Sequence, residues 1–488
     1  MAQNKGAVTI SPIIMSLRNL LSRPRTDMQI ARILAGACVV LYLCIFSILF
    51  FVASGNGASF DTFVGLNLPA KADTQEYVGL AHTMLDAGRF SITPTASPEY
   101  ARPPGYPAFL AMTLAIFGTL TVVPFIQFLL TACTVALIYL TGVRYFPRPV
   151  ALSAAILYMI DPIVIYAAWI PITESLFMIL LIGSVYTIGV QFRRTWLPFA
   201  AAGVLLGLAV YMRPIGLYVA PIIACMALAH ATSWRTGLFN AAIFMIATFC
   251  IVSPWMTRNY LLAGHFSFDS VRDWQFYSVN MPLFEQVRTG IGYQTTLENN
   301  NERFFGTHDY FILRSFEYAD REASITRSVL LAHPFQYLAF HLFKSAQFFV
   351  SSSIVNVTYH MYQLGILTGD HAQGEGAWGM LTQHRWRDAF VQTFTHIPRL
   401  IERMFLALAY ASAVYATAAA ICRKDSRMIW IICAFLLLNA FAILTGPGSD
   451  DTRYRMPSEP FVFLLASYGA YSLWPRIQKR IRLPIRSA

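Results

Sequence analysis

The side chains best suited to chemistry stand beside long apolar stretches of this sequence. Three carboxylates occupy such positions: Asp73, Glu76 and Glu174. Five arginines do so as well: Arg102, Arg213, Arg258, Arg453 and Arg455. A carboxylate can remove a proton from a hydroxyl group, and arginine binds phosphate oxygens in pairs while staying charged near a low-dielectric boundary. Together these residue types indicate chemistry on a lipid phosphate at a membrane surface.

Each of these residues also has a purely structural explanation. An isolated Asp73 fits a solvated loop, and Glu174 fits the first turn of a helix, where the helix dipole favours an acid. Arg102 and Arg213 can extend toward lipid headgroups. Glu76, three residues after Asp73, is expected on a helix surface rather than in catalysis. The functional interpretation therefore depends on these side chains meeting at one face of the protein.

The sequence predicts no metal-ligating residues. Five histidines lack the spacing that would place two ligands on one helix face: His82, His308, His360, His371 and His384. Mg²⁺ or Mn²⁺ would suit oxygen ligands, but nothing in the sequence requires either ion. A glycine-rich phosphate loop after a strand is absent, which argues against a nucleotide-sugar donor.

The composition indicates the class of protein to which these residues belong. The 488-residue chain is 56% hydrophobic and 12% charged, which is far more apolar side chain than one soluble core can bury. Its net charge of +11 comes from basic residues at the ends of apolar stretches, where they satisfy the positive-inside rule. This distribution predicts a polytopic membrane protein that contacts membrane lipids and binds no nucleic acid, with both termini in the cytoplasm.

About ten transmembrane helices are predicted, within a range of 10–12. They cover residues 31–53, 121–142, 149–170, 173–192, 197–212, 216–231, 237–255, 400–421, 428–446 and 459–475. The chain divides into an N-terminal catalytic module at 1–255, with its first outer loop at 54–120, a periplasmic and interfacial part at 256–398, and C-terminal helices with a basic cytoplasmic tail at 399–488. The number of crossings around 324–370 is left open.

Local signals predict how the helices are interrupted. Asp161 followed by Pro162 is typical of a helix cap and a first helical position, so the third span is expected to break there. Thr173 is expected to cap the next helix. Tyr106 to Phe117 is too short to cross a membrane and is predicted to lie on the outer surface. One partly amphipathic helix, around Ser324 to Ser352, is predicted to lie at the membrane interface.

Several short motifs resemble those of the GT-C membrane glycosyltransferases, in the branch of the protein O-mannosyltransferases and lipid A aminoarabinose transferases (glycosyltransferase family 39-like). They include an acid soon after the first membrane helix and a basic-Pro-Pro element. In order, the motifs are "ADTQEY" at 72–77, "RPPGYP" at 102–107, "PITESLF" at 171–177, "MRPIG" at 212–216, "SPWMTRNYLLAGHF" at 253–266 and "RYRMP" at 453–457. They extend over nearly the whole chain and stand at predicted outer helix ends.

The resemblance implies an all-α GT-C fold and a glycosyltransferase of the EC 2.4 class. Such an enzyme transfers a sugar from a polyprenyl-phosphate donor to a glycan, glycolipid or protein acceptor outside the membrane, with inversion. Asp73 matches the family's acid in the first outer loop and would be the general base. Glu174 matches a second acidic position, which would position the acceptor or a cation. Some relatives carry two adjacent acids where this chain has Asp73 followed by Thr74.

The resemblance also implies the donor phosphate site. Arg102 matches the basic residue before the double proline, and with Arg453 and Arg455 it would hold the phosphate. Arg213 and Arg258 are further candidates for this site. Tyr454, which stands between two of these arginines, is a candidate of undefined role.

Two other functions fit the same features. A polymerase or ligase of surface polysaccharide would also use acids and arginines on a lipid phosphate. A secondary transporter or flippase would also contain broken helices, although its polar residues would gather near the membrane midplane and in repeated halves. The expected location is a bacterial inner membrane, with the active site on the periplasmic side.

Overall fold

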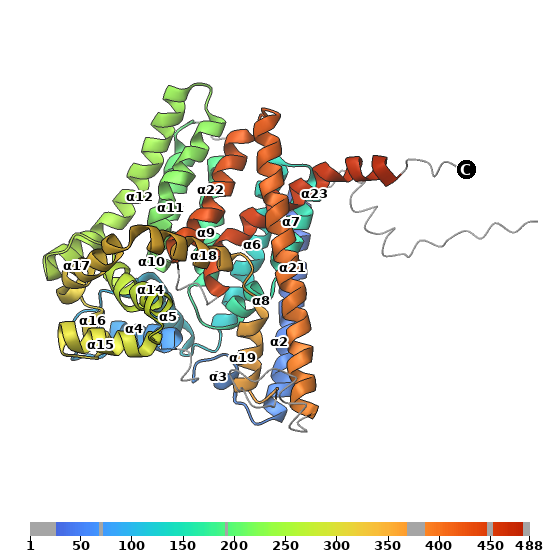
Figure 1. Cartoon of the computed structure of the whole chain (residues 1–488). Helices are drawn as coiled ribbons and strands as arrows, with labels where there is room; N and C mark the ends of the chain where they lie inside the picture. Colours follow the sequence, from blue (N-terminus) through green and yellow to red (C-terminus); the bar gives the residue numbers. More distant parts are fainter. Residues whose placement is uncertain (1–25, 68–71, 191–193, 368–385, 447–451, 482–488) are drawn as a thin grey trace, which may run out of the picture.

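The computed structural model describes residues 26–67, 72–190, 194–367, 386–446 and 452–481, and these residues form helices and no strands. The predicted all-α class is therefore confirmed for the described chain. The basic segments at both ends, 1–25 and 482–488, lie outside it. Figure 1 shows long helices running side by side, with shorter helices gathered around one end of them.

Five helices are long and apolar enough to cross a membrane. They are α2 (Asp27–Gly55), α6 (Val123–Tyr145), α12 (Trp234–Ala263), the His396–Cys422 part of α21 (Trp386–Cys422), and α22 (Met428–Thr445). A bent pair, α7 (Arg148–Ile160) and α8 (Pro162–Trp169), makes a sixth candidate. The described residues thus belong to a multi-pass membrane protein.

Shorter apolar helices complete this bundle. They are α9 (Glu174–Ile188), α10 (Leu197–Met212), and α11 (Ile215–Cys225) with the 3-10 helix η1 (Met226–His230). The last helix, α23 (Glu459–Ile481), packs against α7 and α21 and begins directly after the 3-10 helix η4 (Thr452–Ser458). Each of the ten predicted spans therefore has a helical counterpart, while the count of actual crossings stays a prediction.

Small residues let neighbouring helices of the bundle approach closely. A Cβ atom on Gly203 of α10 would lie 2.3 Å from the carbonyl oxygen of Phe244 in α12. Thr248 of α12 donates a hydrogen bond to the Gly203 carbonyl oxygen at 3.1 Å. In a lipid environment such packing replaces the hydrophobic effect as the force that holds helices together.

The predicted break at Asp161 is confirmed. The Asp161 side chain accepts a hydrogen bond from the Ile163 backbone N–H at 2.9 Å, and α8 is bent by 54° from α7. The predicted side-chain cap at Thr173 is wrong. Thr173 stands at the cap position of α9, but its hydroxyl group donates to the Glu174 carboxylate at 3.2 Å instead.

The shorter helices at one end of the bundle come from two parts of the chain. The first loop gives α3 (Phe60–Phe63), α4 (Ala72–Ala87) and α5 (Gly105–Phe117). The segment after α12 gives α13 (Val271–Gln275), the π-helix η2 (Phe276–Asn280), α14 (Met281–Thr289), α15 (Tyr293–Phe305), α16 (Tyr310–Leu313), α17 (Phe316–Ala332), α18 (Pro334–Phe348) and α19 (Ile354–Gln363). Helix α5 matches the short helix predicted at Tyr106 to Phe117, while its place on the outer surface stays a prediction.

The single helix predicted around Ser324 to Ser352 is wrong. The chain forms α17 and α18, separated at His333, because Pro334 has no N–H to continue the first helix and stands at the start of the second. In Figure 1, α18 crosses in front of the bundle, at a steep angle to α12 and α21. An interfacial position of α18 remains a prediction.

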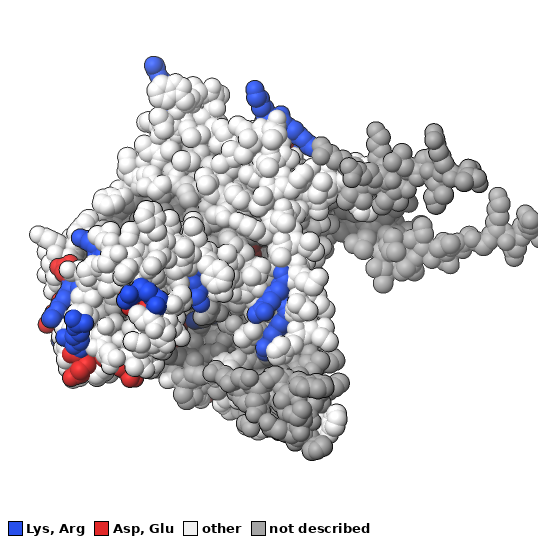
Figure 2. All heavy atoms as spheres, viewed as in Figure 1, with Lys and Arg blue, Asp and Glu red and all other residues white. Residues whose placement is uncertain are grey.

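Charged side chains are unevenly distributed over the surface. On the face shown in Figure 2, acidic side chains gather on the lobe that α15 and α17 help to form. On the same face, the charged side chains seen at the helix tips of the opposite end are mainly basic. This asymmetry agrees with the predicted orientation, in which the short helices lie outside the cytoplasm.

Candidate active site

Asp73, in the first turn of α4, lies between two arginines from distant parts of the chain. One carboxylate oxygen lies 2.7 Å from a terminal nitrogen of Arg102, and the other lies 3.1 Å from a terminal nitrogen of Arg453. Arg453 belongs to η4, 380 residues away in the sequence. The predicted convergence of this acid with these arginines is therefore confirmed.

The segment before α5 fixes the backbone at Arg102. Glu99 accepts hydrogen bonds from the backbone N–H groups of Ala101, at 2.7 Å, and Arg102, at 3.0 Å. Pro103 and Pro104 then restrict the backbone ahead of α5. This turn directs the Arg102 guanidinium group back toward α4, where it also lies 5.3 Å from the ring centre of Tyr77.

Glu76 is a buried member of this network, so its expected place on a helix surface is wrong. It is 8% exposed, and its carboxylate lies 2.6 Å from Nε of Arg102 and 3.0 Å from Arg314. One turn of α4 separates Asp73 from Glu76, so both acids contact the same guanidinium group.

Arg314 was not identified from the sequence. It follows α16, is 3% exposed, and lies 3.7 Å from Glu99 as well as contacting Glu76. The aromatic ring of Tyr310 stacks beneath its guanidinium group at 4.4 Å. The surrounding sequence resembles an ordinary polar loop, so no local pattern marks Arg314 as the partner of residues more than 200 positions away.

Glu174 and Arg213 form a second ion pair close to the first. Their charged atoms lie 2.6 Å apart, and Glu174 is 3% exposed. Arg213 ends α10, and its guanidinium group lies 5.2 Å from the ring centre of Tyr454. Tyr454 thereby joins this pair to η4, which also carries Arg453.

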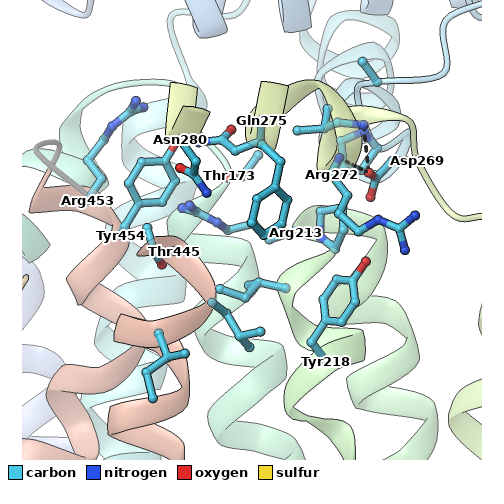
Figure 3. A pocket seen from close by; sticks show the side chains of 18 of the residues that line it. Thr173, Arg213, Tyr218, Asp269, Arg272, Gln275, Asn280, Thr445, Arg453 and Tyr454 are labelled. Carbon is cyan, nitrogen blue, oxygen red and sulfur yellow. Dashed lines mark hydrogen bonds between the residues drawn. The ribbon is translucent and has the colours of Figure 1, made fainter. Parts of the chain in front are cut away.

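Most of these residues line one cavity of about 730 Å³, although Glu76, Glu99 and Arg314 do not. Its charged part contains Asp73, Arg102, Glu174, Arg213 and Arg453. Figure 3 shows Arg453 and Tyr454 on one side, Asp269, Arg272 and Tyr218 on the other, and Gln275 and Asn280 between them. Five separate parts of the chain, namely the first loop, the start of α9, the end of α10, the segment after α12 and η4, thus contribute to a single site.

A further part of the cavity lining is apolar and open to the outside. It includes side chains that are about half exposed or more: Leu331, Leu338, Ile443 and Leu444. Two of these residues belong to the end of the apolar helix α22, and one belongs to α18. The cavity therefore combines a charged interior with an apolar side.

The arginines determine the protonation state of Asp73. Burial raises the pKa of its carboxyl group, but the charges and hydrogen bonds of Arg102 and Arg453 lower it further, so the pKa falls well below its usual value. Asp73 is consequently an anion at neutral pH. In contrast, burial raises the pKa of Asp269 to about 6, against two hydrogen bonds from backbone N–H groups that lower it.

Arg258 and Arg455 do not line the cavity. Arg258 donates to the Glu99 carbonyl oxygen at 3.1 Å and lies 4.6 Å from the ring centre of Trp255. Arg455 is 2% exposed and pairs with Glu459 at 3.0 Å and with Glu402 at 3.5 Å. These contacts hold both arginines outside the cavity, which Arg102, Arg213 and Arg453 line.

Among the residues that the structure describes, no group of three or more His, Cys, Asp or Glu side chains could hold a metal ion. In the cavity, Asp73 and Glu174 contact arginines, and Asp269 accepts hydrogen bonds from backbone N–H groups. These contacts identify no ligand set for the Mg²⁺ or Mn²⁺ that the resemblance suggested.

One part of the chain matches a known protein family. Residues 101–257 match the dolichyl-phosphate-mannose-protein mannosyltransferase family. The matched segment covers about a third of the chain and includes Arg102, Glu174 and Arg213 of the cavity. For this segment, the predicted resemblance to GT-C membrane glycosyltransferases is confirmed. No curated protein sequence matches the chain.

Two solved structures show a distant likeness. An oligosaccharyltransferase from Archaeoglobus fulgidus, in complex with Zn and sulfate, aligns over 90% of this chain and 50% of its own at 14% identity, with a TM-score of 0.41. ArnT from Cupriavidus metallidurans, bound to undecaprenyl phosphate, aligns over 92% of this chain and 81% of its own at 15% identity, with a TM-score of 0.38. This chain therefore spans half the length of the archaeal enzyme, and scores this low establish no shared activity.

Proposed function

We propose that the protein is a membrane glycosyltransferase that moves a sugar from a polyprenyl-phosphate donor to an acceptor hydroxyl group. The observation that carries this proposal is the Asp73 carboxylate held by Arg102 and Arg453 in a cavity with an open apolar side. An anionic lipid headgroup needs cations, and its hydrocarbon tail needs an apolar path out of the site. The match of residues 101–257 supports the same class of donor.

The donor phosphate would compete with Asp73 for its two arginines. Arg102 and Arg453 keep the pKa of Asp73 too low for an efficient base, because a general base works best with a pKa near the working pH. A phosphate that takes up the same guanidinium groups would weaken their contacts with Asp73 and raise its pKa. Donor binding would in this way prepare the base that the reaction needs.

The transfer itself would then proceed in one displacement. The acceptor oxygen attacks the anomeric carbon, the bond between that carbon and the phosphate oxygen breaks, and the acceptor proton passes to the Asp73 carboxylate. Polyprenyl phosphate leaves as an anion, which Arg102, Arg213 and Arg453 would stabilise. Glu174 would hold Arg213 in place through its 2.6 Å ion pair.

The protein's setting follows from the same proposal. The site would face the periplasm of a bacterial inner membrane, because the basic helix tips lie at the other end of the molecule. The acceptor would be a glycan, glycolipid or protein on that side.

The proposal is tested with the full chain in proteoliposomes that contain undecaprenyl phosphate linked to radiolabelled sugars, together with an envelope extract as acceptor. We expect the sugar to leave the donor lipid and appear on an acceptor. Asp73→Asn should lower this rate by about 10²- to 10⁴-fold, the usual contribution of a general base. Asp86→Asn, on the same helix but exposed, is the matched control.

Movement of the intact lipid-linked sugar across the bilayer, with no bond cleavage, would instead support the transporter alternative. Growth of a polysaccharide chain on its own lipid carrier would support the polymerase alternative. Transfer by Asp73→Asn at the wild-type rate would remove this residue from the mechanism.

A further inference from the structure

A π-helix forms one wall of the cavity. The segment η2, Phe276–Asn280, directly continues α13, and in this conformation each N–H bonds to the carbonyl five residues earlier rather than four. Residues five apart therefore lie about one turn above one another, which places Gln275 and Asn280 on the same side. Both residues line the cavity. π-helical turns are rare and occur often at functional sites.

Neither side chain has all of its polar atoms satisfied within the protein. Asn280 is 3% exposed, and its Oδ1 atom has no hydrogen-bond partner. Leaving a buried carbonyl oxygen unpaired is unfavourable unless a ligand satisfies it. Gln275 makes no side-chain hydrogen bond with any residue that the structure describes, and its amide points toward the middle of the cavity in Figure 3.

The position of Gln275 and Asn280 indicates a role other than phosphate binding. Figure 3 places both amides between the side that carries Arg453 and the side that carries Arg272 and Asp269. Carboxamides carry no charge and offer both donors and acceptors, which suits hydroxyl groups better than an anion. Phe276, which also lines the cavity, adds an aromatic surface beside them.

Resting on the proposed function, we propose that Gln275 and Asn280 form a subsite for the hydroxyl groups of the donor's sugar. The guanidinium groups of Arg102 and Arg453 hold the phosphate, and the two amides of the π-helix bind the sugar attached to it. The subsite selects a neutral polyol and makes no contribution to binding the bare lipid phosphate.

The test measures binding of four lipids to the full chain in nanodiscs: undecaprenyl phosphate alone, and the same lipid carrying mannose, glucose or arabinose. Wild-type protein should bind at least one sugar-bearing lipid about tenfold more tightly than the bare lipid, as expected for two neutral hydrogen bonds. Gln275→Ala and Asn280→Ala should remove most of that difference and leave the affinity for undecaprenyl phosphate unchanged.

Gln294→Ala, which removes an exposed amide on α15 that does not line the cavity, is the control and should behave as wild type. If Asn280→Ala unfolds, Gln275→Ala alone decides the outcome, because that side chain is only half-buried. Retention of the sugar-dependent gain by the variants would overturn the subsite. An absence of any such gain in wild-type protein would also overturn it, whereas failure of wild-type protein to bind even undecaprenyl phosphate would refute the proposed function itself.

Discussion

At the scale of single residues, the candidate site is an alternating chain of charges. Arg453, Asp73, Arg102, Glu76 and Arg314 follow one another at distances of 2.6 to 3.1 Å. Each interior member contacts two groups of opposite sign, so removing one member leaves a neighbour partly uncompensated in a poorly hydrated place. Each guanidinium group in this row of alternating charges therefore has two roles, because it can bind a ligand and it also stabilises its neighbours.

Arg314 provides a test of this arrangement. Arg314→Ala should destabilise the protein by about 3 to 5 kcal/mol, since it leaves Glu76 with one of its two cations missing. The double variant Arg314→Ala with Glu76→Gln should be more stable than the sum of the two single changes predicts. Thermal unfolding in detergent measures both effects, and Arg303→Ala, on exposed α15, is the control. Strictly additive losses would show that the two residues do not interact.

Glu322 predicts a dependence of stability on pH. It lies on α17, is fully buried, and neither carboxylate oxygen has a hydrogen-bond partner. Burial, followed by the nearby charge of Asp273, raises its pKa to about 9. The folded protein therefore keeps this proton up to about pH 9, while the unfolded chain releases it near its usual pKa of about 4.3.

Stability should consequently fall as the pH rises between these two values, by at most about 1.4 kcal/mol for each pH unit. Glu322→Gln, which cannot lose a proton, should flatten this slope. Unfolding followed at pH 5, 6.5 and 8 compares the two proteins. Equal slopes would mean that Glu322 does not titrate in this range.

At the scale of elements, close packing of α5 against α10 fixes the position of Arg102. A Cβ atom on Gly105, the first residue of α5, would lie 2.6 Å from the carbonyl oxygen of Tyr211. Only glycine permits this approach without a backbone shift. The turn that carries Arg102 ends three residues earlier, so displacing α5 displaces the guanidinium group from Asp73.

Gly105→Ala should therefore lower both the unfolding temperature and the affinity for undecaprenyl phosphate. The matched control is Gly36→Ala in α2, where a new Cβ would meet nothing within 4 Å. This control should be neutral or slightly stabilising, because alanine favours a helix over glycine. Wild-type affinity in Gly105→Ala would show that α5 tolerates displacement.

How far a feature of the structure could be predicted from the sequence depends on the range of the interactions that produce it. The break at Asp161 was predictable because capping depends on adjacent residues, and α5 was predictable from its length. The split between α17 and α18 should also have been recognised from Pro334. The burial of Glu76, the contact of Arg314 and the π-helix η2 depend on packing between distant segments, and no local pattern encodes them. The meeting of Asp73 with Arg453 was expected because both stand at predicted outer helix ends, and the resemblance to a known family supported it.

At the scale of the whole molecule, the site lies at one end of a helical bundle whose other end is basic. This arrangement predicts which loops face the cytoplasm. Cysteines introduced at Thr232 and Thr295, both exposed, should be labelled from opposite sides of the membrane. The background for labelling should lack the five exposed native cysteines, Cys44, Cys133, Cys225, Cys250 and Cys422.

In right-side-out vesicles, a membrane-impermeant maleimide should label Thr295→Cys and spare Thr232→Cys, and inside-out vesicles should reverse the result. Labelling of both positions from the same side would contradict the orientation of the cavity.

The division of the chain at residues 255 and 398 remains a prediction that limited proteolysis of the same vesicles can address.

The most direct test of the central claim is an experimental structure of the full chain in nanodiscs with undecaprenyl phosphate. Our account predicts that phosphate oxygens lie within hydrogen-bonding distance of both Arg102 and Arg453, that the Asp73 carboxylate has moved away from at least one of them, and that the lipid tail leaves past Leu338 and Ile443. Phosphate bound elsewhere, with both ion pairs of Asp73 intact, would contradict it.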